Sequence, residues 1–359
     1  MALAALSAAC KEPDDTARVL EILAGAAAHP NEEAEAGPHD HVNPRLLRRF
    51  EPLREQIEST KYPITSAKVE LGRMLFFDPR LSAKQNVSCN TCHDLKHYGV
   101  DHQVTSAGTH GARGGRNSPT VYNSAGFFAQ FWDGRAADVE TQALGPLLNP
   151  LEMALPSAEH GARILESIPG YVTAFKAAFP AEAEPVTLAN AGLAIGAFER
   201  KLTTPSRWDR YLRGQHDALT ATEQEGLSVF TNVGCMGCHT GELVGGSMYQ
   251  KAGSVEPWPN QADQGRYEVT KQEVDRMMFK VPTLRNIAET APYFHDGSAA
   301  TLEQAVKLMG THQLGLSLSE HEIQAIIAWL RSLTGTLPEQ YVAPPELPPS
   351  SPLTPGPIP

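Results

Sequence analysis

Apolar residues follow helical spacing along most of the chain, and the sequence has no alternating stretch long enough to suggest a sheet. The stretch SAKVELGRMLFF ends at Asp78-Pro79, where the proline ring stops a helix. The stretch TLANAGLAIGAFERKL again carries apolar residues at helical spacing. These patterns predict a mainly α protein.

Two more helices are predicted from capping boxes, in which Ser or Thr is followed three residues later by Glu or Gln. In TATEQEGLSVF the predicted pair is Thr222 and Glu225, and in SEHEIQAIIAWLRSLTG it is Ser319 and Glu322. The second of these helices ends at Gly335. Its apolar face is predicted to consist of Ile323, Ile326, Ile327 and Leu330.

Composition sets the broad class of the protein. The chain has 359 residues, of which 41% are hydrophobic, and this is enough for two domains with cores of their own. The formal net charge is −11. This charge argues against nucleic acid or an anionic membrane as the main partner, and a basic or neutral protein partner is easier to accommodate.

Four of the five cysteines lie in two Cys-x-x-Cys-His motifs. The first consists of Cys89, Cys92 and His93, and the second of Cys235, Cys238 and His239. Two disulfides or half of a zinc site are the alternatives, but a zinc site needs further Cys or His ligands at matching spacing. A histidine directly after the second cysteine is typical of covalent haem attachment. The motifs therefore predict two haem c groups.

Haem attachment of this kind takes place outside the bacterial cytoplasm, so we expect a periplasmic protein. The start MALAALSAAC is apolar but lacks the basic region of a signal peptide. It is either the end of such a signal, a degenerate lipoprotein signal with Cys10 as the lipidated residue, or a tail with a stray cysteine. Elsewhere the sequence has no apolar run of membrane-spanning length.

The predicted architecture is two tandem cytochrome c-like haem domains with long loops. We expect an export signal, a tether and an N-terminal extension over residues 1–60. The first haem domain is expected over residues 61–203 and the second over 204–336, with the junction near Leu202 to Trp208. Residues 337–359 are rich in proline and are predicted to be extended.

The sixth ligand of each iron decides the chemistry, because His93 and His239 occupy only one side of each haem. For the second haem, Met309 at the end of a short predicted helix is a candidate, with Met277 and Met278 as competitors. Core packing is the alternative role for Met309. Thr301 and Gln304 are predicted to cap that short helix, and Gly310 to end it.

Three histidines follow the first motif. His97 stays on the proximal side if the anchoring helix continues, whereas His102 and His110 lie far enough along the chain to cross the ring. His110 lies in the glycine-rich stretch GTHGARGG, which suits a ligand that comes and goes. An exposed loop histidine is the alternative role for His110.

Two further residues are candidates for the site. Trp132 is an aromatic that bridges two haems or is simply part of the core. Glu152 lies between apolar neighbours, where a carboxylate can have a raised pKa and transfer protons, although an ordinary surface acid is commoner.

The chain resembles the bacterial di-haem cytochrome c peroxidases. The matching stretches run in the family's order from about Ile64 to Thr336, nearly all of the folded part. They are SCNTCH, GRNSPTVYN, QFWDGRAAD, LEM, GCMGCH, FKVPTLRNI, TAPYFHDGS and LMGTHQL.

The resemblance implies a role for each matching position. The haem on Cys89, Cys92 and His93 is implied to be the low-potential peroxidatic haem, with His110 as its removable ligand. The haem on Cys235, Cys238 and His239 is implied to receive electrons, with Met309 as its axial ligand. Trp132 is implied to lie between the haems, and Glu152 and Gln142 to line the peroxide pocket, Glu152 as acid–base. The implied calcium ligands are Asn117 and the backbone oxygens of Thr290 and Pro292.

The resemblance also implies partners. Hydrogen peroxide is the expected substrate, a small cytochrome c or a cupredoxin the expected electron donor, and a homodimer the expected assembly. The C-terminal segment is implied to pack on the first haem domain. Two other classes remain as alternatives: a di-haem electron carrier, and the related enzymes that oxidise tryptophans of a partner protein, in which a tyrosine replaces the axial methionine.

Overall fold

The computed structural model describes residue 42 and residues 44–358. The expected export signal, most of the tether and Cys10 lie outside the described residues. No helix in the described part of the chain is long and apolar enough to span a membrane.

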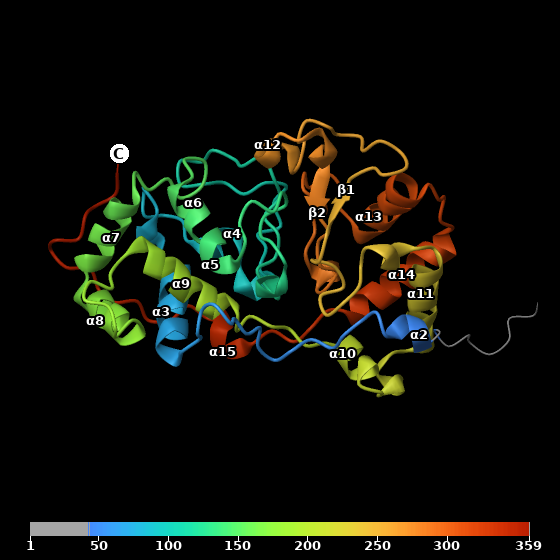
Figure 1. The fold of residues 1–359 in the computed structure, drawn as a ribbon, viewed down its shortest axis with the longest axis horizontal. Coiled ribbons are helices and arrows are strands. Elements are labelled where there is room, and N and C mark those ends of the chain that lie inside the picture. The colour runs from blue at the N-terminus through green and yellow to red at the C-terminus, as the bar shows by residue number, and fades with distance from the viewer. Residues whose placement is uncertain (1–41, 43, 359) are drawn as a thin grey trace, which may run out of the picture. The chain divides into compact units, whose positions relative to one another are not determined.

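The fold is mainly α, as predicted (Figure 1). In the first half the helices are α2 (Pro44–Leu47), α3 (Ser66–Phe77), α4 (Cys89–Cys92), α5 (Val139–Gln142), α6 (Leu144–Leu148), α7 (Ala158–Glu166), α8 (Pro169–Ala178) and α9 (Leu188–Glu199). In the second half they are α10 (Arg207–Leu212), α11 (Ala221–Asn232), α12 (Tyr267–Thr270), α13 (Leu302–Met309), α14 (Glu320–Ser332) and α15 (Glu339–Val342). Two short antiparallel strands, β1 (Tyr249–Lys251) and β2 (Met278–Lys280), pair with Tyr249 opposite Lys280.

Most helix boundaries agree with the sequence patterns, but α14 ends at Ser332, before the predicted Gly335, and the chain continues beyond α13 as a π-helix over Gly310–Leu314. Helix α3 ends at Phe77, directly before Asp78-Pro79, and the capping box of α14 is formed by Ser319 and Glu322. The prediction for α11 was wrong by two residues, because its capping box is formed by Thr220 and Glu223. Glu223 is also held by Arg207 through two hydrogen bonds of 2.5 and 2.9 Å, which fixes this earlier pair.

Each half has its own hydrophobic core. In the first half, α3 and α9 cross where Gly72 meets Ala194, and a Cβ on Gly72 would lie 1.9 Å from the Ala194 carbonyl oxygen. In the second half, α11 and α14 cross in the same way, and a Cβ on Gly226 would lie 1.9 Å from the Ala325 carbonyl oxygen. The two haem-anchor motifs are therefore each supported by the same kind of close helix crossing.

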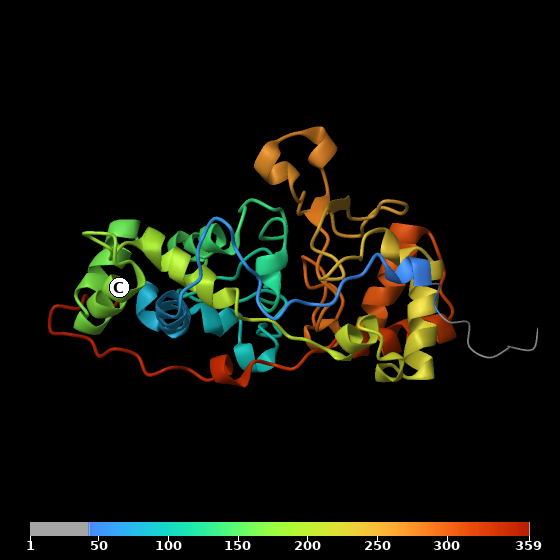
Figure 2. The same ribbon diagram turned by 60° about the horizontal axis from the view of Figure 1, so that its bottom comes forward.

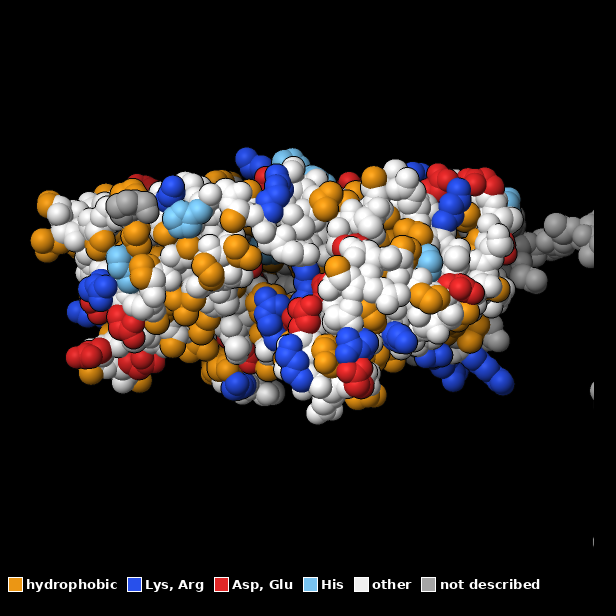
Figure 3. Space-filling model, turned by 90° about the horizontal axis from the view of Figure 1, so that it is seen from above, with side chains coloured by type: hydrophobic (Ala, Val, Ile, Leu, Met, Phe, Trp, Pro, Cys, Tyr) orange, Lys and Arg blue, Asp and Glu red, His pale blue; other side chains and the backbone are white. Residues whose placement is uncertain are grey.

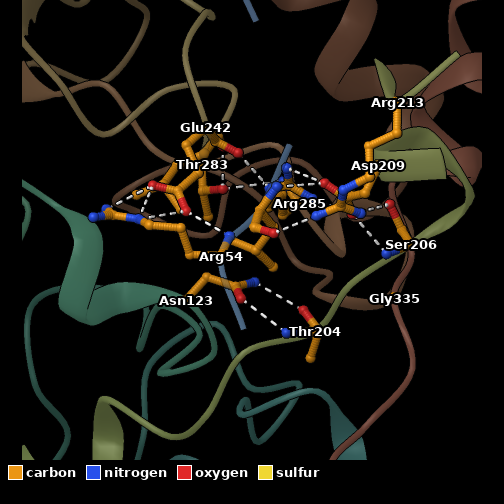
Figure 4. Close-up of polar contacts among 12 residues, drawn as sticks. Arg54, Asn123, Thr204, Ser206, Asp209, Arg213, Glu242, Thr283, Arg285 and Gly335 are labelled. Carbon is orange, nitrogen blue, oxygen red and sulfur yellow. Dashed lines mark hydrogen bonds and ion pairs between the residues drawn. The ribbon is translucent and has the colours of Figure 1, made fainter. Parts of the chain in front are cut away.

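The two halves also resemble each other in the loops that follow their haem anchors. Asn123 and Asn286 have left-handed backbones, with φ of 62° and 60°. The Asn123 side chain donates a hydrogen bond of 2.8 Å to the Thr204 hydroxyl (Figure 4). The Asn286 side chain donates another of 2.8 Å to the same hydroxyl, so the two repeats meet at one residue. Thr204 thus ties the two halves together.

Two extended segments bind both halves. Residues 50–58 run along both (Figure 2): Leu53 N–H donates to Asp209 in the second half, and Ile57 N–H to the Arg200 carbonyl in the first. The C-terminal segment lies on the first half, where Arg80 donates to the Pro348 carbonyl and Ile358 N–H to the Ala83 carbonyl.

Candidate active site

The four described cysteines are unpaired thiols, which excludes the two-disulfide alternative for Cys89, Cys92, Cys235 and Cys238. Burial is the main cause that raises the pKa of Cys89 to about 12 and that of Cys92 to about 11. Burial likewise raises the pKa of Cys235 to about 12. In the described residues no cluster of three or more His, Cys, Asp or Glu side chains could hold a metal ion.

A cavity of about 240 Å³ opens beside the second anchor. Cys235, Cys238 and His239 line it, and so does Met309 from the end of α13. Burial lowers the pKa of His239 to about 4, against the opposing effect of the Val244 and Pro282 carbonyls, so the ring is neutral at pH 7. The His239 Nδ1 lies 3.3 Å from the Val244 carbonyl oxygen.

This cavity suits a covalently bound haem. Two thiols, a neutral imidazole and a thioether face one space whose other walls are mostly apolar, among them Phe230, Leu302, Val306, Ile326 and Leu330. Of the competing methionines, Met277 packs in the core beside Trp258, and Met278 lies in β2. Met309 is therefore the methionine that shares the cavity with His239.

The first anchor also fits a haem. The His93 side chain is partly buried, its Nδ1 atom is buried without a hydrogen-bond partner among the described residues, and burial lowers its pKa. Helix α4 ends at Cys92, so the anchoring helix does not continue to His97. The exposed His97 pairs with Asp94 at 2.9 Å, and the His102 Nδ1 lies 2.9 Å from the Ala291 carbonyl oxygen.

His110 lies on a tight turn beside Glu152. Gly108 and Ala112 close this turn with a backbone hydrogen bond of 2.8 Å, and the His110 side chain is exposed. Thr109 N–H donates a hydrogen bond of 2.7 Å to the Glu152 carbonyl. The structure therefore brings the predicted removable ligand and the predicted acid–base residue together through their backbones.

The Glu152 side chain is partly buried. Burial raises its pKa, and the hydrogen bond from Asn149 (2.8 Å to Oε1) and the charge of Arg135 oppose this rise only in part. Glu152 in turn raises the pKa of both Cys89 and Cys92, because its charge lies near their thiols. Gln142, at the end of α5, is half-buried, and no side-chain hydrogen bond is found for it within the described chain.

Trp132 lies where the two halves meet. Its indole Nε1 donates to the Asn117 carbonyl at 2.9 Å, and its own carbonyl accepts from Lys280 N–H at 2.8 Å. The ring lies 6.3 Å from that of His295, edge to face. His295 is itself stacked on Phe279 at 4.1 Å. The loop geometry thus places Trp132 in the wall of the second haem cavity.

The expected calcium ligands line that same cavity. Asn117, Thr290 and Pro292 all contribute to its wall. The Asn117 amide nitrogen donates to the Gln103 carbonyl at 2.9 Å, which leaves its oxygen free to face a cation. Amide and carbonyl oxygens are the neutral donors that Ca²⁺ accepts alongside carboxylates and waters. The three residues offer neutral oxygen donors of the kind that Ca²⁺ accepts, and no described Asp or Glu lines the cavity beside them.

Comparison with known proteins decides among the classes. Residues 66–217 match the protein family described as di-haem cytochrome c peroxidase. The cytochrome c551 peroxidase of Nitrosomonas europaea is 47% identical over 295 residues, which cover 82% of this chain and 87% of that protein. The chain belongs to the di-haem cytochrome c peroxidase family.

Other matches support the same assignment. The cytochrome c551 peroxidase of Pseudomonas aeruginosa is 44% identical over 325 residues, covering 89% of this chain and 93% of that protein. The crystal structure of a MauG-like protein associated with microbial copper homeostasis has a TM-score of 0.70 at 27% identity, covering 88% of this chain and 98% of that chain. This di-haem peroxidase is therefore an oxidoreductase with two haem c groups, and the family predicted from the sequence is confirmed.

Sequence patterns missed a buried acidic cluster in this di-haem peroxidase. Arg200 forms a two-pronged ion pair with Glu140 of α5, at 2.7 and 2.9 Å, and both side chains are buried. Burial, together with the charge of Glu140, raises the pKa of the neighbouring Glu199 to about 8 despite Arg200. Glu199 also contributes to the raised pKa of Cys89, so this carboxyl lies near the first haem anchor. Glu199 and Arg200, at the end of α9, gave no sequence signal of their contact with Glu140, 60 positions before Arg200.

Proposed function

We propose that this peroxidase reduces hydrogen peroxide to water at the haem on Cys89 and Cys92. We further propose that electrons enter through the haem on Cys235 and Cys238. The observation that carries this proposal is the difference between the two surroundings. A partly buried carboxylate with a raised pKa lies near the first pair of thiols, whereas none of the described residues that line the cavity of the second is acidic.

The reaction consumes one hydrogen peroxide, two electrons and two protons and yields two waters. When bound, the haem pair supplies the electrons and an iron site for the oxidant. Glu152 accepts a proton from one peroxide oxygen and returns it to the oxygen that departs, so that water leaves instead of hydroxide. Gln142, which lies on α5 and whose amide has no hydrogen-bond partner among the described residues, orients the peroxide by hydrogen bonding. Because the pKa of Glu152 is raised, activity falls as the pH drops through that pKa and the base becomes protonated.

His110 is proposed as the sixth ligand of the first iron in the resting enzyme. With the haem bound, peroxide would reach that site only after His110 moves away from it. The turn that carries His110 has a left-handed Gly111 (φ 78°), and a Cβ at Gly111 or Gly114 would meet no atom within 4 Å. Open space around the turn supports movement of the ligand, and the bond from Thr109 to the Glu152 backbone couples this movement to the acid–base residue.

His239 and Met309 are proposed as the permanent ligands of the second iron, and a methionine ligand raises the reduction potential. Trp132 is proposed to carry electrons between the two sites, supported by the hydrogen bond of its indole to Asn117 in the first half and that of its carbonyl to Lys280 in the second. Calcium is proposed to bind at Asn117, Thr290 and Pro292, which belong to both halves. The proposed donor is a small cytochrome c or cupredoxin, in the periplasm, and the proposed assembly is a homodimer.

The charge pattern on one face of the protein is compatible with either proposed donor, a small cytochrome c or a cupredoxin. Seen in Figure 3, basic and acidic side chains lie next to one another near the middle of this face. Among the ion pairs of the described chain, Arg276 pairs with Glu273 and Arg266 with Asp275. Mixed charge of this kind favours a donor without a strong charge of its own.

Substitution Glu152→Gln tests the assigned roles. We expect kcat for peroxide to fall by about 10²- to 10⁴-fold, the usual contribution of a positioned acid–base group, while the haem spectra stay unchanged. The matched control is Glu159→Gln, because Glu159 is a fully exposed acid on α7, and its turnover should equal that of the unmodified enzyme. Equal turnover for Glu152→Gln and the control would remove Glu152 from the mechanism.

A further inference from the structure

Lys280, the last residue of β2, is a buried lysine without an acidic partner. Its side chain is 5% exposed, and its ammonium lies 3.8 Å from the centre of the Phe127 ring. No ion pair or side-chain hydrogen bond joins it to another described residue, and burial lowers its pKa to about 7. A buried ammonium that is unpaired is costly, so such groups normally have a counter-charge.

Lys280 belongs to the wall of the second haem cavity. It lies two residues before Pro282, whose carbonyl acts on His239, and both residues line the cavity. Its backbone N–H donates to the Trp132 carbonyl at 2.8 Å, just as Asn117 N–H donates to the His295 carbonyl at 2.8 Å in the other repeat. Lys280 is thus the counterpart of Asn117 in the duplicated fold.

The cavity supplies no protein carboxylate for this ammonium. Among the described residues that line it there is no Asp or Glu, and the other lysine, Lys251, is exposed. A haem c carries two propionate carboxylates, which need cationic or hydrogen-bonding partners when they are removed from water. A haem propionate would therefore supply the negative charge that the buried Lys280 ammonium lacks.

We propose that Lys280 pairs with a propionate of the haem anchored at Cys235 and Cys238 and raises the reduction potential of that haem. A fixed positive charge, and the neutralised propionate, both favour the ferrous state over the more positive ferric state. The pairing deepens the proposed role of the second haem as the place where electrons enter, and its importance for electron flow rests on that role. Lys280 acts here as a positioning residue and touches neither iron nor peroxide.

The test is a spectroelectrochemical titration of the haem-loaded protein carrying Lys280→Met. At a fixed electrode potential we expect the ratio of reduced to oxidised second haem to fall about tenfold. This is the order expected for one unit charge at an effective dielectric of about 20. A tenfold change equals about 59 mV for a one-electron couple. The first haem should keep its potential. Because no turnover is measured, a failure of the proposed electron route would not alter this readout.

Two matched variants complete the test. Lys280→Arg keeps the charge and should restore most of the potential, and it also serves if Lys280→Met loads haem poorly. Lys251→Met removes an exposed lysine from the same cavity wall and should change the ratio less than twofold, because solvent screens that charge. An unchanged second haem in Lys280→Met, an equal change in both haems, or the same fall in Lys280→Arg would each overturn the pairing.

Discussion

The ion pair between Asp209 and Arg285 holds the N-terminal segment to the second half of the molecule. Both side chains are fully buried, and the two oxygens of Asp209 accept from Arg285 at 2.8 and 3.0 Å (Figure 4). The same carboxylate accepts from Leu53 N–H and from Ser206 N–H, each at 2.7 Å. One carboxylate therefore accepts hydrogen bonds from at least four buried donor groups, for which water is not available as another acceptor.

Substitution Asp209→Asn keeps the size of this side chain but removes its charge and one acceptor. Whichever way the amide turns, its NH₂ group faces either Leu53 N–H or Ser206 N–H, together with one nitrogen of Arg285. Breaking a buried ion pair in this way costs about 3–5 kcal/mol. Such a loss is a large part of the roughly 5–15 kcal/mol by which domains are usually stable.

Guanidinium denaturation, followed by far-ultraviolet circular dichroism and by haem absorbance, measures this loss. The control is Glu303→Gln, which removes an exposed pair with Lys307 at 2.7 Å and should cost less than about 1 kcal/mol. A loss below about 1 kcal/mol for Asp209→Asn would refute the reasoning, because water would then be reaching the buried donors.

This pair also predicts an acid dependence. Burial alone would raise the pKa of Asp209, but the hydrogen bonds and charge of Arg285 outweigh burial and lower it. The stability from Asp209 is therefore present above the ordinary pKa of 3.8 and is lost as the pH falls through the lower folded value. Asp209→Asn should lack this part of the acid transition.

Three further predictions concern individual sites. Because the pKa of Glu199 is raised to about 8, its contribution to stability is complete below the ordinary value of 4.5 and is lost as the pH rises towards 8. Between pH 5.5 and 8.5 the unmodified protein should therefore lose roughly 3 kcal/mol at most in guanidinium denaturation, and Glu199→Gln should not show this loss. Parallel curves of unfolding free energy against pH for the two proteins would contradict this. Met309→His should lower the potential of the second haem in a redox titration and leave the first unchanged, whereas an unchanged second potential would show that Met309 is only core packing. Chelation of calcium should slow peroxide turnover, and Ca²⁺ should restore turnover better than Mg²⁺, because Mg²⁺ demands stricter octahedral geometry. Asn117→Ala should weaken Ca²⁺ binding measured by calorimetry, and unaltered binding would exclude this site.

Local patterns were sufficient for the parts of the fold that depend on near neighbours. The anchors follow from Cys-x-x-Cys-His, and α3 follows from its apolar spacing and the proline after it. The start of α11 did not follow, because TATEQE offers two pairs with capping-box spacing, Thr220 with Glu223 and Thr222 with Glu225. The contact between Glu223 and Arg207 distinguishes the two pairs, and this contact is tertiary.

The electrostatics of the site depended on contacts that sequence spacing does not encode. Arg285 pairs with a carboxylate 76 positions away, and Arg200 with one 60 positions away. Nothing in the sequence around Lys280 indicates that its side chain is buried, because lysine side chains are usually exposed. Its burial results from the packing of β2 against Phe127 and the second cavity.

Peroxide turnover with a reduced cytochrome c donor tests the central claim most directly. The fully oxidised enzyme is compared with enzyme reduced beforehand by one electron, with calcium present in both. We predict fast turnover only after this reduction, because His110 must leave the first iron before peroxide can bind. Equal turnover in both states would contradict the gate formed by His110, and no turnover in either, with intact haem spectra, would contradict the proposed peroxidase mechanism itself.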